Sequence, residues 1–258
     1  MMMATNPAPE RPPAPLRPAD SEARRLSGMI FVAGQSLASR FRLYGREAFA
    51  EHLQAIAPDL GDYHVTGSTA GGSVASSNNY FPNPKAEGAA RRWWWNADTG
   101  TEGPALVEAL EAIEALGARN WSALVFDLGQ HEAIWKALGS ERSFQDIALS
   151  YAIAVPNVLR RLREALSPAD PEALPILFVP LGPQKPSGRM RRAHEFGPFR
   201  AMQYEIIAAT PNCHAVGSVI DMDMQDMLHP SQEGVEYYAR KVAEKFAWVL
   251  KGGMNRAS

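Results

Sequence analysis

Residues 28–34, GMIFVAG, form an apolar run that ends in glycine, and the polar turn QSLAS (35–39) follows directly. Four later stretches repeat this character, each short and largely apolar: DYHVTG (62–67), SALVFDLG (122–129), LPILFVPLG (174–182) and HAVGSVID (214–221). Longer segments of helical period separate them, and this alternation is typical of parallel strands joined by crossover helices. Because the runs are almost continuously apolar, we expect a sheet that is covered on both faces. The pattern predicts one doubly wound α/β domain with five parallel strands.

Three intervening segments carry helix signals. A proline in the first turn and a glycine at the end mark a helix over residues 103–117. A capping pattern, Ser143 with Asp146 three positions on, opens a second helix that is expected to bend near Pro156. The segment 234–250 places one apolar stripe on a single face, formed by Val235, Tyr238, Val242, Phe246 and Val249.

Composition narrows the class of protein. The chain has 258 residues, a formal net charge of −2 and a pI near 6.3, which argues against a nucleic-acid partner. A lone cysteine, Cys213, excludes an intrachain disulfide framework. Residues 1–27 contain six prolines and predict a disordered tail, so the single domain is expected over 28–253. With neither a signal-like apolar run nor a stretch long enough to span a membrane, we expect a cytoplasmic protein.

Ligands of open α/β sheets bind beyond the carboxyl ends of the strands, so the loops there are where chemistry is expected. Ser36 directly follows the first strand, and His229 follows the fifth in DMQDMLHPSQEG. Serine becomes a useful nucleophile when an imidazole takes its proton and a carboxylate orients that imidazole. Asp226, three positions before His229, is the candidate orienter, and Asp221 and Asp223 are rivals. Taken singly, each of these residues is better explained as a helix cap or a solvated loop residue. Their joint placement after the first and fifth strands is what favours the catalytic interpretation.

A tetrahedral intermediate also needs donors aimed at its oxyanion. The turn TGSTAGGS after the second strand supplies glycines, of which Gly71 is the first candidate and Gly72 the second. A merely flexible turn would look the same. After the third strand, Gln130 and His131 both offer side-chain donors, and Glu132 is in position to cap the next helix. Nothing local chooses between Gln130 and His131.

These blocks resemble the SGNH (GDSL-like) hydrolase superfamily, and within it the GQS branch that includes carbohydrate acetylesterases and sialate O-acetylesterase-like enzymes. VAGQSLAS looks like the first block, with Ser36 as nucleophile, and DMLHPSQEG looks like the last, with Asp226 and His229. The resemblance spans residues 29–250. It implies a three-layer α/β/α sandwich of flavodoxin-like type and hydrolysis of small acyl esters through an acyl-enzyme, without metal or cofactor.

The middle blocks match the family less closely. TAGGSVA is similar to the second block, which implies that the amide of Gly71, or of Gly72, joins the amide of Ser36 in an oxyanion hole. The third block usually reads Gly-x-Asn-Asp, or Gln-Gly-Glu in the GQS branch, whereas this chain has GQHEA. Either Gln130 or His131 supplies the missing asparagine's contact, or the hole is incomplete.

Two segments bear on the substrate. RRWWWNADTG (91–100) has three consecutive tryptophans, of which at least one is expected at the surface as a platform for a sugar or a partner. Covering a sheet edge or a subunit contact is an equal alternative. Gln35, Trp94 and Trp95 are the candidate substrate-binding residues. The basic loop 185–192 would attract an anionic sugar, although a solvated charged loop explains it more simply.

The leading hypothesis is therefore a serine esterase that removes acetyl groups from a carbohydrate. One alternative keeps the enzyme and changes the substrate to a lipid, an aryl ester or a thioester. Another is a catalytically weak module that binds a glycan or a partner, which the GQHEA departure would favour. The sequence leaves the oligomeric state open.

Overall fold

The sheet of the computed structural model has five parallel strands, and the structure describes residues 27–79, 92–133, 142–181, 196–217, 222–225 and 229–253. The strand order is β2-β1-β6-β7-β8. The strands are β1 (Gly28–Gly34), β2 (Tyr63–Thr69), β6 (Trp121–Asp127), β7 (Ile176–Phe178) and β8 (Cys213–Ala215). Every neighbouring pair is parallel. The predicted five-stranded parallel sheet is confirmed.

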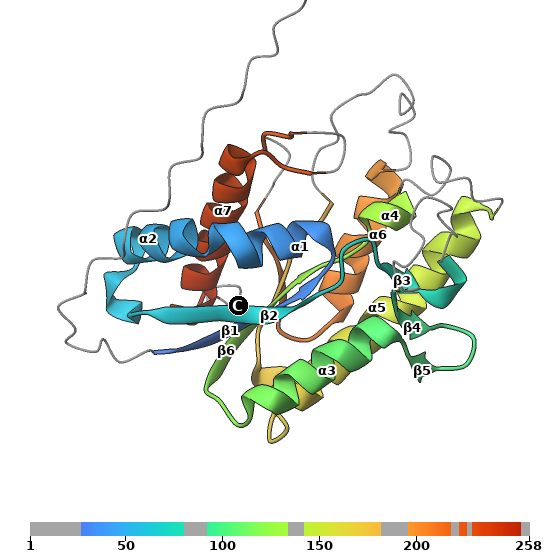
Figure 1. The fold of residues 1–258 in the computed structure, drawn as a ribbon, viewed down its shortest axis with the longest axis horizontal. Coiled ribbons are helices and arrows are strands. Elements are labelled where there is room, and N and C mark those ends of the chain that lie inside the picture. Colours follow the sequence, from blue (N-terminus) through green and yellow to red (C-terminus); the bar gives the residue numbers. More distant parts are fainter. Residues whose placement is uncertain are drawn as a thin grey trace, which may run out of the picture.

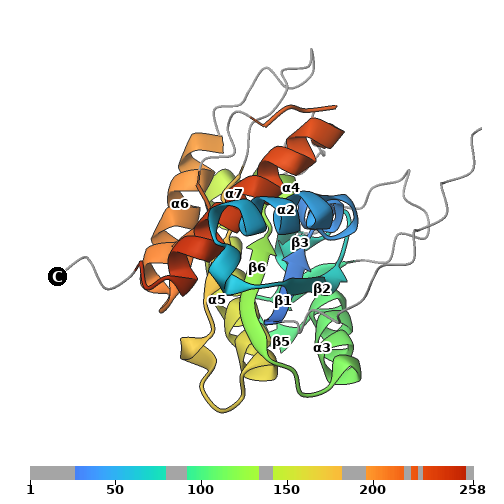
Figure 2. The same ribbon diagram turned by 90° about the vertical axis from the view of Figure 1, so that its left-hand side faces the viewer.

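Both faces of the sheet are buried, as the apolar runs predicted. On β1, Ile30 and Val32 enter one core, whereas Phe31 and Ala33 enter the other. The first core is covered by α1 (Ser36–Arg40), the π-helical turn η1 (Phe41–Gly45), α2 (Arg46–Ile56) and α7 (Gln232–Leu250). The second is covered by α3 (Pro104–Leu116), α5 (Phe144–Leu166) and α6 (Phe196–Ala209). Figures 1 and 2 show α1, α2 and α7 on one side of the sheet and α3 and α5 on the other. The fold is the three-layer α/β/α sandwich that was expected.

The helix signals are also confirmed in their positions. Ser143 caps α5, because its Oγ accepts a hydrogen bond from the Asp146 amide at 3.1 Å. The helix then continues through Pro156. The last helix, α7, starts at Gln232, slightly earlier than predicted, because Ser231 caps it through the Gly234 amide. The predicted apolar stripe of α7 is buried against the sheet. Short helical turns complete this part of the chain: η2 (Pro58–Leu60), η3 (Ser77–Asn79), α4 (Gln130–Ala133) and η4 (Pro171–Ala173).

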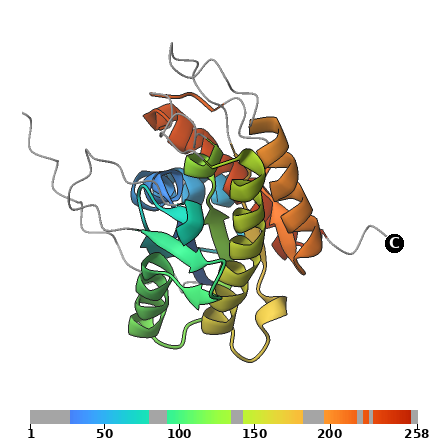
Figure 3. The same ribbon diagram turned by 90° about the vertical axis from the view of Figure 1, so that its right-hand side faces the viewer.

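A second, three-stranded sheet was not predicted. It consists of β3 (Val74–Ser76), β4 (Trp93–Asn96) and β5 (Thr101–Glu102), with β3 parallel and β5 antiparallel to β4. Figure 3 shows this small sheet beside α3 and α5. Both helices contact β4, so the strand is covered and two of its three tryptophans are buried.

The sequence predicted that at least one of the three tryptophans reaches the surface, and neither of the substrate-binding candidates among them does. Trp94 is fully buried and Trp95 is 6% exposed, whereas Trp93 is half-buried. The Trp94 ring lies edge-on to Phe126 of the main sheet, with centroids 6.4 Å apart. Its indole Nε1 donates a hydrogen bond to the Ser73 Oγ at 2.9 Å. These side chains cover the sheet, which was the alternative to sugar binding.

Several regions of the sequence fall outside the described residues. They include nearly all of the predicted tail, the basic loop 185–192, and the aspartates Asp221 and Asp226. Within the ranges given above, no helix is long and apolar enough to cross a bilayer.

Gly34, at the end of β1, has a φ of +142°, and a Cβ built there would lie 2.0 Å from the Asp127 carbonyl oxygen. We therefore expect Gly34→Ala to lower the free energy of unfolding by at least about 2 kcal/mol, because it adds both backbone strain and an overlap with backbone atoms. Urea denaturation measures this. Gly197→Ala is the matched control, since nothing lies within 4 Å of the position that its Cβ would take. Equal stability of the two variants would contradict the close approach of β1 and β6.

Candidate active site

The turn that carries Ser36 is fixed by neighbouring backbone. The Gln35 amide donates to the Asp127 carbonyl at 3.0 Å, which ties the end of β1 to the end of β6. The Gly34 carbonyl accepts from the Ala70 amide at 2.9 Å, which ties the same turn to the loop after β2. Ser36 then starts α1 and stays partly exposed. The nucleophile candidate therefore stands where the carboxyl ends of three strands meet.

His229 lies on a loop that α7 holds in place. The Gln225 amide donates to the His229 carbonyl at 2.9 Å, and Met224 pairs with Pro230 in an antiparallel bridge. The Ser231 amide donates to the Asp223 carbonyl at 3.0 Å. Gly234 lies so close to that carbonyl that a Cβ would approach it to 2.0 Å. The serine and the glycine of HPSQEG thus cap the helix and fix the histidine loop against it.

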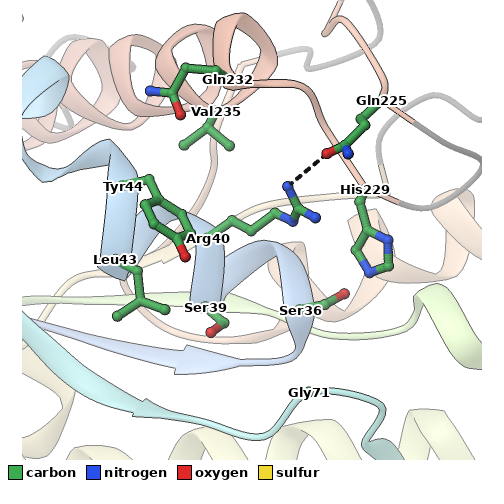
Figure 4. A pocket seen from close by; sticks show the side chains of 10 residues that line it. All are labelled: Ser36, Ser39, Arg40, Leu43, Tyr44, Gly71, Gln225, His229, Gln232 and Val235. Carbon is green, nitrogen blue, oxygen red and sulfur yellow. Dashed lines mark hydrogen bonds between the residues drawn. The ribbon is translucent and has the colours of Figure 1, made fainter. Parts of the chain in front are cut away.

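Ser36 and His229 line the same pocket, a cavity of about 500 Å³. Figure 4 shows the Ser36 hydroxyl pointing toward the imidazole ring of His229, with Gly71 on the opposite side of Ser36. The structure therefore brings together three of the predicted residues from widely separated parts of the chain. Asp226 is outside the described residues, so its role as orienter stays a prediction. Of its rivals, Asp223 has an exposed side chain and uses its carbonyl, not its carboxylate, to receive Ser231.

Of the two candidates after the third strand, Gln130 is the one that contacts the serine. The Ser36 Oγ donates to the Gln130 Oε1 at 3.5 Å. His131 instead lies against the glycine loop, residues 70–73, where its Cε1 would be 3.6 Å from a Cβ on Gly72. Burial lowers the pKa of His131, the neighbouring backbone of Gly72 and Ser73 opposes the shift, and the nearby His229 lowers the pKa further. His131 therefore packs beside the glycine loop and does not contact Ser36 in the way that Gln130 does.

Gly71 and Gly72 occupy different places. Gly71 lines the pocket, and no atom lies within 4 Å of the position that its Cβ would take. Gly72 has a φ of +76° and faces His131, whose Cε1 would lie 3.6 Å from a Cβ. Glycine is thus required conformationally at 72, whereas at 71 it leaves open space beside Ser36. The arrangement favours Gly71 over Gly72 as the oxyanion donor.

The structure corrects the assignment of Gln35, Trp94 and Trp95 as substrate-binding residues. All three are buried, and none of them lines the pocket. In the orientation in which both atoms of its side-chain amide find partners, Gln35 donates to the Ser73 carbonyl at 3.2 Å and accepts from the Gln130 backbone amide at 2.7 Å. Because Trp94 also binds Ser73, these side chains support the glycine loop from behind and do not meet a ligand.

Several pocket residues were missed in the sequence. Arg40 and Tyr44 follow Ser36 at intervals of four residues, and Leu43 lies on the same rim. The rest of the wall comes from Ser39, Gln225, Gln232 and Val235. The spacing of four residues from Ser36 along a helix was a signal that could have indicated Arg40 and Tyr44. The residues from the histidine loop and α7 had no such local signal.

Two buried carboxyl groups lie behind the pocket. Burial raises the pKa of Asp127 to about 8 and that of Glu132 to about 7. The Glu132 Oε1 accepts a hydrogen bond from the Ala75 amide. Among the described residues, the Asp127 Oδ2 and the Glu132 Oε2 have no hydrogen-bond partner. In the same part of the chain, no group of three or more potential ligands is placed to hold a metal ion.

Solved structures of esterases share the three-layer α/β/α fold of this chain. The carbohydrate acetylesterase Est24 from Sinorhizobium meliloti matches with a TM-score of 0.56 at 15% identity, over 86% of this chain and 99% of that one. LAE5, an alpha/beta hydrolase enzyme from the metagenome of Lake Arreo, Spain, matches with a TM-score of 0.54 at 10% identity, over 86% and 95%. A putative arylesterase from Agrobacterium tumefaciens gives 0.50 at 13% identity, over 87% and 98%. No family model matches the chain, and no curated protein matches it in sequence. At these identities the likeness establishes the fold alone.

The raised pKa of Asp127 has a consequence for stability. The folded state holds the Asp127 proton up to a pKa of about 8, compared with 3.8 for the free group, so its contribution favours folding at acid pH. That contribution is lost as the pH rises from about 4 to about 8. We expect Asp127→Asn to be more stable relative to the wild type at pH 8 than at pH 5.

Urea midpoints at the two pH values measure this difference. Asp98→Asn, at an exposed turn, is the control and should shift equally at both. A difference between Asp127→Asn and the wild type that is constant with pH would contradict a buried, protonated Asp127.

Proposed function

We propose that this protein is a serine hydrolase that cleaves short acyl esters, above all O-acetyl esters of a carbohydrate. The observation that carries the proposal is the meeting of the Ser36 hydroxyl and the His229 imidazole in one open pocket. The fold shared with solved esterases supports it, because active sites of such sheets lie at the carboxyl ends of the strands.

The mechanism proceeds through an acyl-enzyme. The Ser36 Oγ attacks the ester carbonyl while His229 takes its proton, and Asp226 holds the imidazole in the productive tautomer. The oxyanion of the tetrahedral intermediate accepts hydrogen bonds from the backbone amides of Ser36 and Gly71 and from the Gln130 Nε2, once that amide has rotated its Oε1 away from Ser36. His229 then gives its proton to the departing alcohol. Water, activated by His229, releases the acid and restores the serine.

The carbohydrate part of the proposal rests on the shape and chemistry of the pocket. A cavity of about 500 Å³ is far larger than an acetyl group needs, so the alcohol portion of the ester occupies most of it. Hydroxyl and amide groups from Ser39, Tyr44, Gln225 and Gln232 line this space. A solved structure of the same fold is that of a carbohydrate acetylesterase. Comparing acetylated sugars with medium-chain and aryl esters separates this substrate from the alternatives.

Labelling with a serine-directed phosphonate, followed by peptide mapping, tests the nucleophile. We expect one adduct, on Ser36, because only a serine activated by His229 reacts readily. Ser36→Ala and His229→Ala should each lower kcat for 4-nitrophenyl acetate by at least about a thousandfold while circular dichroism stays unchanged.

Ser39→Ala is the matched control, since Ser39 lines the same pocket one turn further along α1. This variant should still take up the label at Ser36. An adduct at Ser39, or hydrolysis that survives in Ser36→Ala, would contradict the assignment. A wild-type protein that binds acetylated sugars without cleaving them would favour the binding module instead.

A further inference from the structure

A second hollow lies at the edge of the main sheet opposite to Ser36. It is formed where the end of α5, the turn η4 and the end of α6 meet, just before β7 and β8 begin. Its volume of about 600 Å³ is typical of sites for small molecules. In Figure 2 the turn that follows α5 lies at the lower end of the molecule, whereas α4, which follows the carboxyl end of β6, lies at the upper end. This hollow is therefore separate from the pocket that holds Ser36 and His229.

Asn212 ties the walls of the hollow together. Its Nδ2 donates to the carbonyls of Glu172 and Ala173, at 3.3 and 2.8 Å, which holds η4 against the start of β8. Its own carbonyl accepts a hydrogen bond from the Arg163 Nη2 at 3.0 Å, which joins α5 to the same place. Asp170 caps η4, because its Oδ1 accepts from the Ala173 amide at 3.2 Å. The hollow is thus preformed, as small-molecule sites usually are.

Arg163 brings an unpaired positive charge to this hollow. It is one of the lining residues, yet it is only 4% exposed. Among the residues that the structure describes, its buried Nε has no hydrogen-bond partner and no carboxylate forms an ion pair with it. Burial lowers the pKa of Arg163, because the cation is removed from water without a paired anion, although arginine stays charged in proteins. An anionic group bound in the hollow would supply the missing partner.

The acidic side chains of the hollow differ in how they are held. The Glu164 carboxylate accepts from Arg160 and from Arg161, both at 2.7 Å, so its charge is already balanced. Asp170 and Glu172 are exposed, and in the described part of the chain no cation forms an ion pair with either of them. Negative charge at the rim and a buried guanidinium below it suit a ligand that carries both signs.

Apolar walls complete the hollow. They consist of three prolines and two alanines: Pro156, Pro171, Pro211, Ala169 and Ala209. The rings of proline are rigid, so they present apolar surface at little cost in conformational entropy. A bulky apolar group of a ligand would be removed from water against them.

We propose that this hollow binds a zwitterionic ligand with a bulky apolar body, of the class of an aromatic amino acid. The carboxylate binds the Arg163 guanidinium, the ammonium lies near Asp170 and Glu172, and the side chain packs on the prolines. The inference does not depend on ester hydrolysis. If Arg163 served only to join α5 to Asn212, the hollow would bind no such ligand.

Probes that differ in one charge test the inference. L-phenylalanine carries both charges, N-acetyl-L-phenylalanine lacks the ammonium, and L-phenylalaninamide lacks the carboxylate. The full chain is titrated calorimetrically at about pH 6, where the free amines are protonated. We expect L-phenylalanine to bind at least about tenfold more tightly than either analogue, because each analogue loses a charge-assisted contact. L-alanine should also bind at least about tenfold more weakly, since it leaves the prolines uncovered.

Two variants assign the charges to residues. Arg163→Gln should abolish the advantage of L-phenylalanine over the amide, and Glu172→Gln should reduce its advantage over the N-acetyl derivative. Glu205→Gln is the matched control, because Glu205 is exposed on α6 and does not line the hollow, and it should leave all affinities unchanged. Since Glu172→Gln alters only an exposed side chain, it decides the matter even if Arg163→Gln does not fold.

A wild-type protein that does not bind L-phenylalanine would overturn the inference, as would equal affinities for the three aromatic probes. Affinities that neither variant changes would overturn it too, because the ligand would then bind elsewhere on the protein.

Discussion

The close approach of Gly34 to the Asp127 carbonyl is the contact on which the site depends. At position 34, a residue other than glycine would place its Cβ where a backbone carbonyl of β6 lies. The Gln35 amide completes the contact by donating to the same carbonyl. Because the next residue is Ser36, the direction of its hydroxyl is set by the central pair of strands and not by a flexible loop. The sheet therefore holds the candidate nucleophile in a fixed position.

The glycine loop beside Ser36 is held in a comparable way by buried side chains from three different elements. Gln35 donates to the Ser73 carbonyl, Trp94 donates to the Ser73 hydroxyl, and Glu132 accepts from the Ala75 amide. Donors aimed at a developing oxyanion are effective only when they are fixed before the reaction. Trp94, which the sequence suggested as a surface for binding sugar, therefore supports the glycine loop from the buried side.

Local patterns predicted much of the fold and the two ends of the site. Apolar runs such as GMIFVAG gave the five strands and their burial on both faces, and Ser143 and Ser231 marked helix starts through capping chemistry that needs only near neighbours. The meeting of Ser36 and His229 followed from the rule that loops after parallel strands share one edge. The burial of Trp94 could not be predicted, because β3 and β5, the partners of its strand, are too short to show the alternating pattern of a strand. The buried role of Glu132 depends on Ala75, which lies far away in sequence.

The π-helical turn that links α1 to α2 has one face in the core and one face at the rim of the pocket. Phe41 and Gly45 of this turn are buried, and the Phe41 ring lies 5.3 Å from that of Tyr238 on α7, whereas Leu43 and Tyr44 point outward at the pocket rim. Since Tyr238 belongs to the last helix of the domain, this seam between the first and last helices closes only after nearly the whole domain has been made. Synthesis proceeds from the N-terminus, and contacts between distant segments form late in folding. In a nascent chain Ser36 is therefore made long before His229, and the two side chains can meet only after α7 has left the ribosome.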